Sequence, residues 1–285
     1  MNIIQAHNLA CPIDGGVLSL MDRQLRCANG HSFDIARQGY VNLLPVQHKR
    51  SKQPGDSKAM VLARKQFLNT GIYAPVANKL TEIVIAQISD GGDQCLLDAG
   101  CGEGYYLDTL LKVLKDSDVN AKLSVIGLDI SKDAIIQSAK RAIQVSWVVG
   151  TNRQPPVKKE SVDIILCLFG FLSFDGFNKI LKPGGKLIQL DPGPGHLKEL
   201  REIIYPEVKQ GVHAELPSAV KTGFSLVSSE ALRFESELTG NEIINQLLVM
   251  TPHFYRASKA GREAAAHLTR LKITIDVNFR VLEKA

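Results

Sequence analysis

The chain has 285 residues, of which 45% are apolar and 22% are charged, close to the average for folded globular proteins. This composition excludes a disordered or fibrous chain, and the length allows one large core with a small additional module. Lys and Arg outnumber Asp and Glu by 34 to 29, so the formal charge of +5 allows an acidic partner without requiring one.

No stretch of the sequence predicts a membrane span or a secretion signal. The longest apolar run, residues 164–174, is far shorter than the ~20 residues that a spanning helix needs. Residues 1–5 lack the basic start and the long apolar stretch of a signal peptide. Five cysteines are an odd number, which is typical of a reducing compartment. We therefore expect a cytoplasmic protein with no membrane partner.

The N-terminal part of the chain differs from the rest. Short apolar stretches separated by turn residues predict small hairpins in residues 9–35. A basic stretch with Pro and Gly follows, and we interpret it as an exposed connection. Residues 57–88 then show helical periodicity with a break near Gly71, which predicts two helices. We therefore expect three parts: a module at 1–36, a basic linker at 37–57 and a large domain at 58–285.

Strand and helix patterns alternate through the large domain. Strands are expected at 95–98, 123–129, 145–149, 162–168 and 186–190. Helices are expected from Gly104, from Ser131, around 174–181 and from His196. This alternation predicts an α/β fold, a doubly wound parallel sheet with helices on both faces. Strand-like runs at 225–238 and 272–282 flank a helical run at 241–248 and predict an edge pair that closes the sheet.

The strongest functional signal is a glycine-rich turn after the strand that ends at Asp98. Gly100, Gly102 and Gly104 occupy alternate positions, where glycine lets the backbone turn tightly and approach a ligand. The dinucleotide fingerprint requires glycine where this chain has Tyr105, which disfavours a nicotinamide or flavin cofactor. A carboxylate at the strand end repels a pyrophosphate but attracts the cationic part of S-adenosylmethionine.

Two further polar positions fit the same cofactor. Asp129 ends the next strand, where a carboxylate can accept hydrogen bonds from both ribose hydroxyls. Asn152 follows the third strand, where its side chain can reach the adenine, although polar residues at a strand end are also common in turns. The alternative is an α/β protein with a glycine-rich turn and a capping Asp. Two acids and three glycines in agreement favour S-adenosylmethionine.

These residues resemble the class I S-adenosylmethionine-dependent methyltransferases, whose recurrent turn before a strand matches residues 182–185. Over nearly its whole length the chain resembles the large-subunit ribosomal RNA guanine-N1 methyltransferases. The matching segments are residues 11–34, 39–51, 54–57, 98–106, 192–194, 196–197 and 250–252. The resemblance implies a Rossmann-like methyltransferase domain with an N-terminal zinc-ribbon-like module that recognises RNA.

The same resemblance carries functional expectations. It implies methyl transfer to N1 of a specific guanine in 23S rRNA, and a homodimer whose halves form an RNA cleft. It also implies cofactor contacts at Tyr73, Gly102, Glu103 and His196. The catalytic residues stay unknown. Many amino-methylating relatives have Asn or Asp followed by Pro-Pro after the fourth strand, whereas this chain has Leu-Phe-Gly-Phe at residues 168–171.

Two other features near the fourth and fifth strands bear on the acceptor. Asp191 is only a weak candidate for a base that removes the N1 proton. Phe169 and Phe171 can stack on a flipped guanine, because an enzyme that acts on a base in a stem must expose it. Burial in the core is the more expected role of both rings.

Four residues of the module have the spacing of a ribbon-type metal site. Cys11 and Asp14 are separated by two residues, Cys27 and His31 by three, and twelve residues lie between the two pairs. The resembled family has Cys where this chain has Asp14. Zinc also accepts a carboxylate oxygen, so the four residues can still form a tetrahedral site. The alternative is that the metal has been lost, but so small a module usually needs a staple, which favours zinc.

Basic residues gather directly after the module and fit an RNA backbone. They include His48, Lys49, Arg50 and Lys52, although an ordinary solvated charge run has the same composition. Two other functions stay open. A small-molecule methyltransferase shares the cofactor motif without needing the module, and a non-catalytic RNA-binding protein needs no methyl transfer.

Overall fold

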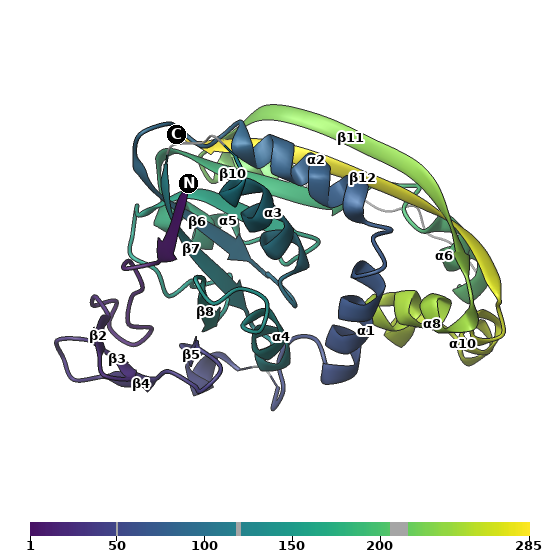
Figure 1. Ribbon diagram of the computed structural model, residues 1–285, viewed down its shortest axis with the longest axis horizontal. Helices are drawn as coiled ribbons and strands as arrows, with labels where there is room; N and C mark the ends of the chain where they lie inside the picture. Colours follow the sequence, from purple (N-terminus) through teal and green to yellow (C-terminus); the bar gives the residue numbers. More distant parts are fainter. Residues whose placement is uncertain (50, 118–120, 206–215) are drawn as a thin grey trace.

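The computed structural model describes residues 1–49, 51–117, 121–205 and 216–285. Within these residues the chain forms a large nine-stranded sheet and a small three-stranded sheet (Figure 1). The strands of the large sheet are β1 (Asn2–Gln5), β5 (Tyr40–Asn42), β6 (Asp93–Ala99), β7 (Lys122–Asp129), β8 (Ser146–Val149), β9 (Val162–Leu168), β10 (Leu181–Pro192), β11 (Phe224–Thr239) and β12 (Arg270–Lys284). The small sheet consists of β2 (Ser19–Met21), β3 (Gln24–Arg26) and β4 (Ser32–Asp34).

The helices connect these strands and cover them. The α-helices are α1 (Lys58–Leu68), α2 (Ala74–Ile85), α3 (Tyr105–Lys115), α4 (Lys132–Ser138), α5 (Phe174–Ile180), α6 (Lys198–Ile204), α7 (Leu216–Lys221), α8 (Asn241–Met250), α9 (His253–Arg256) and α10 (Lys259–Ala266). A short 3-10 helix, η1, spans Val46–His48. Ser57 and Ser131 cap α1 and α4, because each hydroxyl accepts a backbone N–H of the first turn.

The large sheet has the order β11-β12-β10-β9-β6-β7-β8-β5, and β1 pairs with β7. The five strands from β6 to β10 run parallel, and β12 runs antiparallel to both β10 and β11. The β11–β12 ladder extends from the pair Phe224 and Lys284 to the pair Thr239 and Arg270. The predicted doubly wound fold and its closing edge pair are therefore confirmed. The predicted turn at 182–185 is an irregularity within β10, where the register against β9 shifts.

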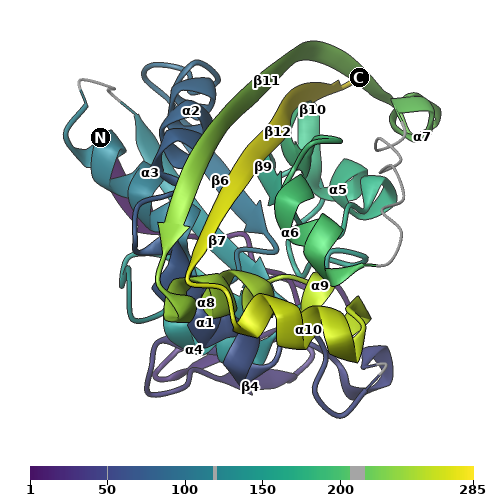
Figure 2. The ribbon, with the colours of Figure 1, turned by 90° about the vertical axis from the view of Figure 1, so that its right-hand side faces the viewer.

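Each face of the sheet has its own apolar core. On β6, Leu96 belongs to one core and Leu97 to the other, because successive side chains of a strand point to opposite faces. Helices α2 and α3 pack on the first face, and α5 and α7 lie on the second (Figure 2). The strands are nearly continuous apolar runs because both of their faces are covered.

The N-terminal module packs against the second face through buried residues such as Leu9 and Leu18. Its backbone is also joined to the loop before β9, since Ala10 N–H donates to the Pro156 carbonyl at 2.9 Å. The predicted hairpins are confirmed as the sheet β2-β3-β4. The module therefore contributes to the second of the two apolar cores.

Two short strands of the N-terminal region pair with the large sheet. Strand β1, assigned to the module, pairs with β7, and strand β5, assigned to the linker, extends the large sheet beside β8. Tyr40 and Val41 are both buried, one in each core. Runs of three or four residues are too short for a periodic signal, and so pairing with the large sheet was not apparent from the sequence. Arg50 of the basic segment lies outside the described residues.

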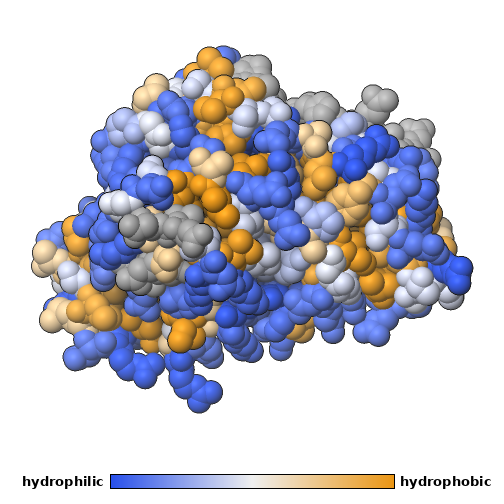
Figure 3. Space-filling model, turned by 45° about the horizontal axis from the view of Figure 1, so that its top comes forward, coloured by the Kyte–Doolittle hydropathy of each residue, from blue (hydrophilic) through white to orange (hydrophobic). Residues whose placement is uncertain are grey.

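Two expectations from the sequence concern membrane-spanning helices and cysteines. Among the described residues, none of the helices has the length and apolar character needed to cross a membrane. The face shown in Figure 3 has hydrophobic residues interrupted by hydrophilic ones. All five cysteines are buried free thiols.

Candidate cofactor pocket and metal centre

A cavity of about 1100 Å³ lies at the carboxyl ends of β6 to β10. The residues that follow each of these strands form its floor, and α1 and the end of α8 supply its opposite wall. The predicted cofactor residues that line it are Tyr73, Asp98, Gly100, Gly102, Glu103, Asp129, Asn152 and His196. The topology therefore brings together residues that are far apart in the sequence at the edge where ligands bind in open α/β sheets.

The glycine-rich turn forms one side of the cavity. Gly100 and Gly102 have φ of +94° and +56°, a left-handed conformation that favours glycine. The Gly102 N–H donates to the Asp129 carboxylate at 2.9 Å, which joins the turn to the end of β7. Gly104, also with positive φ, is absent from the cavity lining, and a Cβ there would lie 2.9 Å from the Cβ of Ser138. Gly104 therefore allows α3 to approach α4 closely.

Asp98 is the next-to-last residue of β6 and is 1% exposed. Its Oδ1 is buried and has no hydrogen-bond partner among the described residues. Burial, and secondly the charge of Asp129, raise the pKa of the Asp98 carboxyl to about 8. An ionised carboxylate without a partner is costly in a buried place, so this site fits a ligand that brings a cationic hydrogen-bond donor.

Asp129 ends β7 and is held in place by the backbone. Its two carboxylate oxygens accept N–H groups from Gly102 at 2.9 Å and from Ser131 at 2.7 Å. Burial raises the pKa of Asp129, and these two hydrogen bonds oppose the rise. Each carboxylate oxygen retains a lone pair that can accept from a hydroxyl of a ligand.

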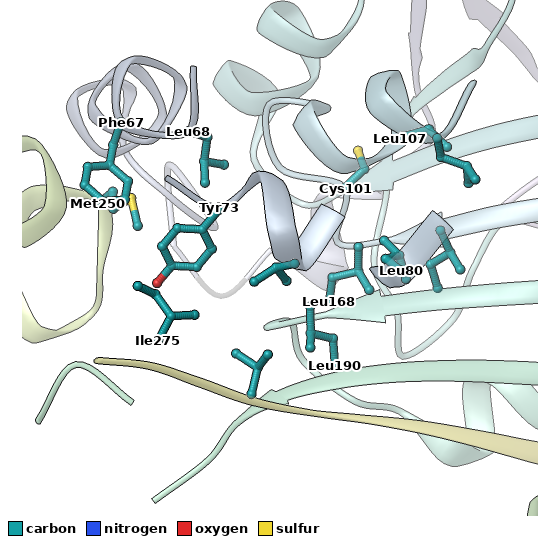
Figure 4. Close-up of a cluster of buried hydrophobic side chains, with 14 of the residues drawn as sticks. Phe67, Leu68, Tyr73, Leu80, Cys101, Leu107, Leu168, Leu190, Met250 and Ile275 are labelled. Carbon is teal, nitrogen blue, oxygen red and sulfur yellow. The ribbon is translucent and has the colours of Figure 1, made fainter. Parts of the chain in front are cut away.

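Tyr73 and His196 form a buried pair on the cavity wall. The Tyr73 Oη lies 3.2 Å from the His196 Nε2, and the His196 Nδ1 accepts the backbone N–H of Asp276 at 3.2 Å. Burial lowers the pKa of His196 to about 4 and raises the pKa of Tyr73. Figure 4 shows Tyr73 among the buried side chains of Phe67, Leu68 and Met250.

Glu103 and Asn152 are both engaged with other parts of the protein. The Glu103 carboxylate, 1% exposed, accepts from Nε of Arg141 at 2.8 Å and also pairs with Nη2. Burial raises the pKa of Glu103, and Arg141 opposes the rise. The Asn152 Nδ2 donates to the carbonyls of Ala99 at 3.2 Å and Phe171 at 2.9 Å. Asn152 therefore fixes the loop after β9 against the end of β6.

The sequence interpretation missed a cluster on the opposite wall. Arg64 of α1 donates to the Asp56 carboxylate at 2.5 Å and to the Met250 carbonyl at 2.8 Å. Both Arg64 and Asp56 line the cavity. Gly55 comes close to Ile130, since a Cβ would lie 2.8 Å from its Cγ2. The one available signal is an arginine between the buried residues of α1.

The expectation that Phe169 and Phe171 are core residues is wrong. Their exposed fractions are 39% and 55%, and both rings line the cavity. The loop after β9 turns away from the core at these positions, which apolar composition alone does not indicate. Asp191, at the end of β10, also lines the cavity.

The four predicted metal ligands converge in the module. The donor atoms of Cys11, Asp14, Cys27 and His31 all lie within 4.8 Å of one another. The His31 Nδ1 is 3.0 Å from the Asp14 carboxylate, 3.4 Å from the Cys27 sulfur and 3.6 Å from the Cys11 sulfur. Tetrahedral zinc with ordinary bond lengths separates a nitrogen and a sulfur ligand by about 3.5 Å. The donor set and its spacing therefore fit zinc.

Asp14 is prepared for this role by its surroundings. Its carboxylate accepts the Gly16 N–H at 2.8 Å and the Asn29 side-chain amide at 2.9 Å. Hydrogen bonds from Gly16 first, and then from Asn29, hold the pKa of Asp14 well below its ordinary value. The group is thus ionised at neutral pH, as a metal ligand must be.

Comparisons with known proteins agree with this architecture. A family model described as "RlmA, N-terminal" matches residues 9–52, and a model described as "Methyltransferase domain" matches residues 96–185. The chain is 30% identical over 279 residues to the 23S rRNA (guanine(748)-N(1))-methyltransferase of Streptomyces fradiae, with 96% of this chain and 95% of that protein covered. It is 26% identical over 277 residues to YxjB of Bacillus subtilis (strain 168), to which 23S rRNA guanine-N1 methylation is provisionally ascribed, with 95% of each covered.

A solved structure, the YcgJ protein of Bacillus subtilis, is 16% identical with a TM-score of 0.46, covering 72% of this chain and 97% of that one. The sheet order, the glycine-rich turn and the methyltransferase domain define a class I S-adenosylmethionine-dependent methyltransferase with an N-terminal zinc ribbon. More narrowly, the chain belongs to the 23S rRNA guanine-N1 methyltransferase family.

Proposed function

We propose that this protein transfers a methyl group from S-adenosylmethionine to N1 of a specific guanine in 23S rRNA. Family membership over nearly the whole chain supports the acceptor. The observation that supports S-adenosylmethionine as the cofactor is the buried Oδ1 of Asp98. This atom lies beside the glycine-rich turn and has no hydrogen-bond partner among the described residues. The α-ammonium group of S-adenosylmethionine supplies the cationic donor that this position lacks.

The other lining residues would hold the rest of the cofactor. Asp129 would accept hydrogen bonds from the ribose hydroxyls of the cofactor. Gly100 and Gly102 would let the backbone approach the cofactor closely. Asn152 forms the wall beside the adenine. Tyr73 can direct its hydroxyl hydrogen toward the cofactor, since His196 Nε2 carries the proton of that neutral ring when Nδ1 accepts from Asp276.

S-adenosylmethionine supplies an electrophilic methyl group on a sulfonium. The chain supplies position, because the reaction needs an acceptor nitrogen in line with that methyl group and no protein nucleophile. Glu103 fixes the turn through its buried ion pair with Arg141. The cavity at the strand ends would partly shield both reactants from bulk water.

In the module, Cys11, Asp14, Cys27 and His31 would hold one zinc ion as ligands. Zinc would fix the hairpins of the small sheet, and the rigid module would present its surface to the RNA. The basic residues that follow, among them Lys49 and Lys52, would contact the phosphate backbone.

Two finer expectations rest on the family resemblance and on the cysteine chemistry. A homodimer would place two modules beside one RNA cleft, and a mass measurement on the purified protein in solution tests this. A cytoplasmic location agrees with five free thiols, which a reducing compartment keeps unpaired.

The test is a transfer reaction with methyl-labelled S-adenosylmethionine and 23S rRNA from a strain lacking the modification. Label is expected in the RNA, and the variant Asp98→Asn is expected to transfer less when the cofactor concentration is below saturation. A panel of small amine and hydroxyl acceptors runs in parallel, because label there and none in RNA would indicate a small-molecule methyltransferase. Cofactor binding without any transfer, or no binding, would instead indicate a non-catalytic RNA-binding protein.

A further inference from the structure

We propose that the acceptor guanine stacks on the rings of Phe169 and Phe171 and donates its N1–H to the carboxylate of Asp191. This inference rests on the proposed function and locates the acceptor base within the cavity. The three residues follow β9 and end β10, next to the strand ends that carry the cofactor residues.

Phe169 has an unfavourable backbone conformation and an exposed ring. Phe169 has φ of +53°, a conformation that a bulky side chain rarely adopts, and its N–H donates to the Leu190 carbonyl at 2.8 Å. The ring is 39% exposed in the cavity. Non-glycine residues in this conformation occur preferentially at functional sites. One face of the ring is supported by His196, with centroids 5.8 Å apart and planes 29° apart.

Phe171 extends the aromatic surface. Its ring is 55% exposed, and the guanidinium carbon of Arg153 lies 4.7 Å from its centroid. The hydrogen bond from Asn152 to the Phe171 carbonyl fixes the loop. Exposed aromatic rings with an adjacent arginine are the surfaces on which flipped or single-stranded bases stack.

Asp191 supplies an acceptor that lines the same cavity as these rings. It directly follows Leu190, whose carbonyl holds Phe169. Its Oδ2 accepts from Arg280 at 3.2 Å and from the side-chain amide of Gln189. Both of these hydrogen bonds go to Oδ2, and none from the described residues goes to Oδ1. An oxygen in this position matches the N1–H of guanine, whereas unmodified adenine has no donor at its N1.

The charged and titratable groups around Asp191 come from several elements. Arg280 faces it from β12, the Cys167 thiol from β9, and Asp98 and His196 lie on the same cavity. Burial raises the pKa of Asp191, while Arg280 opposes the rise. The carboxylate is therefore a better proton acceptor than an exposed aspartate.

The reaction balances with this assignment. N1 forms a bond to the methyl carbon, the bond between that carbon and sulfur breaks, and its electron pair stays on the sulfur. The N1 proton passes to Oδ1 of Asp191 and leaves to solvent afterwards. The products are neutral 1-methylguanine and the neutral thioether.

The first test is the variant Asp191→Asn, compared with wild type in single-turnover reactions with saturating rRNA and cofactor. We expect the rate of the variant at neutral pH to be at least about 100-fold lower than that of wild type. We also expect the variant's rate to rise about tenfold per pH unit toward the ionisation of guanine N1, while the wild-type rate levels off. Calorimetry is expected to give unchanged affinity for S-adenosylmethionine. A variant with the rate and pH profile of wild type overturns the role of Asp191.

The second test measures stacking without turnover. Trp147 is the single tryptophan of the chain and is 2% exposed, so the variant Phe171→Trp adds one exposed reporter. Its fluorescence is expected to be quenched by unmethylated 23S rRNA in the presence of S-adenosylhomocysteine. Phe169→Ala and Phe171→Ala are expected to weaken rRNA binding at least about tenfold, and Phe171→Tyr to retain it.

A control separates these results from general effects of apolar truncation. Leu226→Ala removes an exposed side chain of β11 that is outside the cavity, and it should bind rRNA as wild type does. If wild type methylates rRNA while Phe169→Ala and Phe171→Ala bind it normally, the aromatic site is wrong and the proposed function stands. If wild type methylates no rRNA, the proposed function itself is wrong.

Discussion

Tyr73 and His196 are 123 positions apart in the sequence, and their side chains meet at 3.2 Å. The pair joins the start of α2 to the segment between β10 and α6, and it closes one wall of the cavity. Because Asp276 donates its backbone N–H to the other ring nitrogen, the orientation of the imidazole is fixed.

The variant Tyr73→Phe tests this pair. It leaves a buried His196 N–H without its acceptor, which costs about 1–3 kcal/mol of the free energy of unfolding. Denaturant unfolding should show this loss, and calorimetry should show weaker S-adenosylmethionine binding. Tyr40→Phe is the control, since Tyr40 is also buried but its hydroxyl makes no hydrogen bond with a described side chain. Equal stability of the two variants would contradict the role of the pair.

The raised pKa of Asp98 predicts that the free energy of unfolding depends on pH. Its pKa in the folded protein, about 8, is above the ordinary value of 3.8, so the folded state binds the proton more tightly than the unfolded state. The stability from this group is present below pH about 4 and is lost as pH rises toward about 8. Without cofactor, Asp98→Asn should therefore be more stable than wild type at pH 8, with a smaller difference at pH 4.

Unfolding curves at the two pH values measure this effect, and calorimetry adds the second half of the prediction. The stabilised variant should bind S-adenosylmethionine at least about tenfold more weakly, which corresponds to a loss of 1.4 kcal/mol or more. A variant with unchanged affinity would show that the unpartnered oxygen is unrelated to the cofactor.

The ion pair between Glu103 and Arg141 should be important for stability once one partner is removed. Arg141→Ala leaves a carboxylate that is 1% exposed without its counter-charge, at a cost of about 3–5 kcal/mol. The double variant Glu103→Gln with Arg141→Ala removes both charges and should recover part of that loss. Chemical denaturation of wild type, the two single variants Glu103→Gln and Arg141→Ala, and the double variant gives the coupling energy, and strictly additive effects would be inconsistent with a buried pair.

Zinc should be bound at one ion per chain and should stabilise the module. Metal analysis after dialysis tests the amount, and a chelator should lower the melting temperature. Asp14→Asn should lose metal, because a neutral amide replaces the anionic ligand. Asp14→Cys should retain it more tightly, since a thiolate is a better zinc ligand than a carboxylate. Zinc-free wild-type protein with normal stability would exclude the site.

The sequence predicted the elements that carry strong periodicity. Strands β6, β7 and β9 are apolar runs buried on both faces, and the positions of Asp98 and Asp129 follow directly from their ends. The four predicted metal ligands converge in the structure, and the sequence could indicate them because their spacing is local.

The missed features depend on long-range packing. Strand β5 has three residues and exists because β8 offers an open edge. Arg64 reaches the cavity only because α1 packs on α8, and the exposure of Phe171 depends on a loop that leaves the core. The same residues in a different tertiary structure would not lie at this cavity.

The nucleoside that receives the methyl group tests the central claim most directly. RNA treated with the protein and S-adenosylmethionine is digested to nucleosides, and chromatography with mass spectrometry separates the methylguanosine isomers. The account predicts 1-methylguanosine that is absent from untreated RNA. Methylation at N2, at N7 or on another base would contradict it.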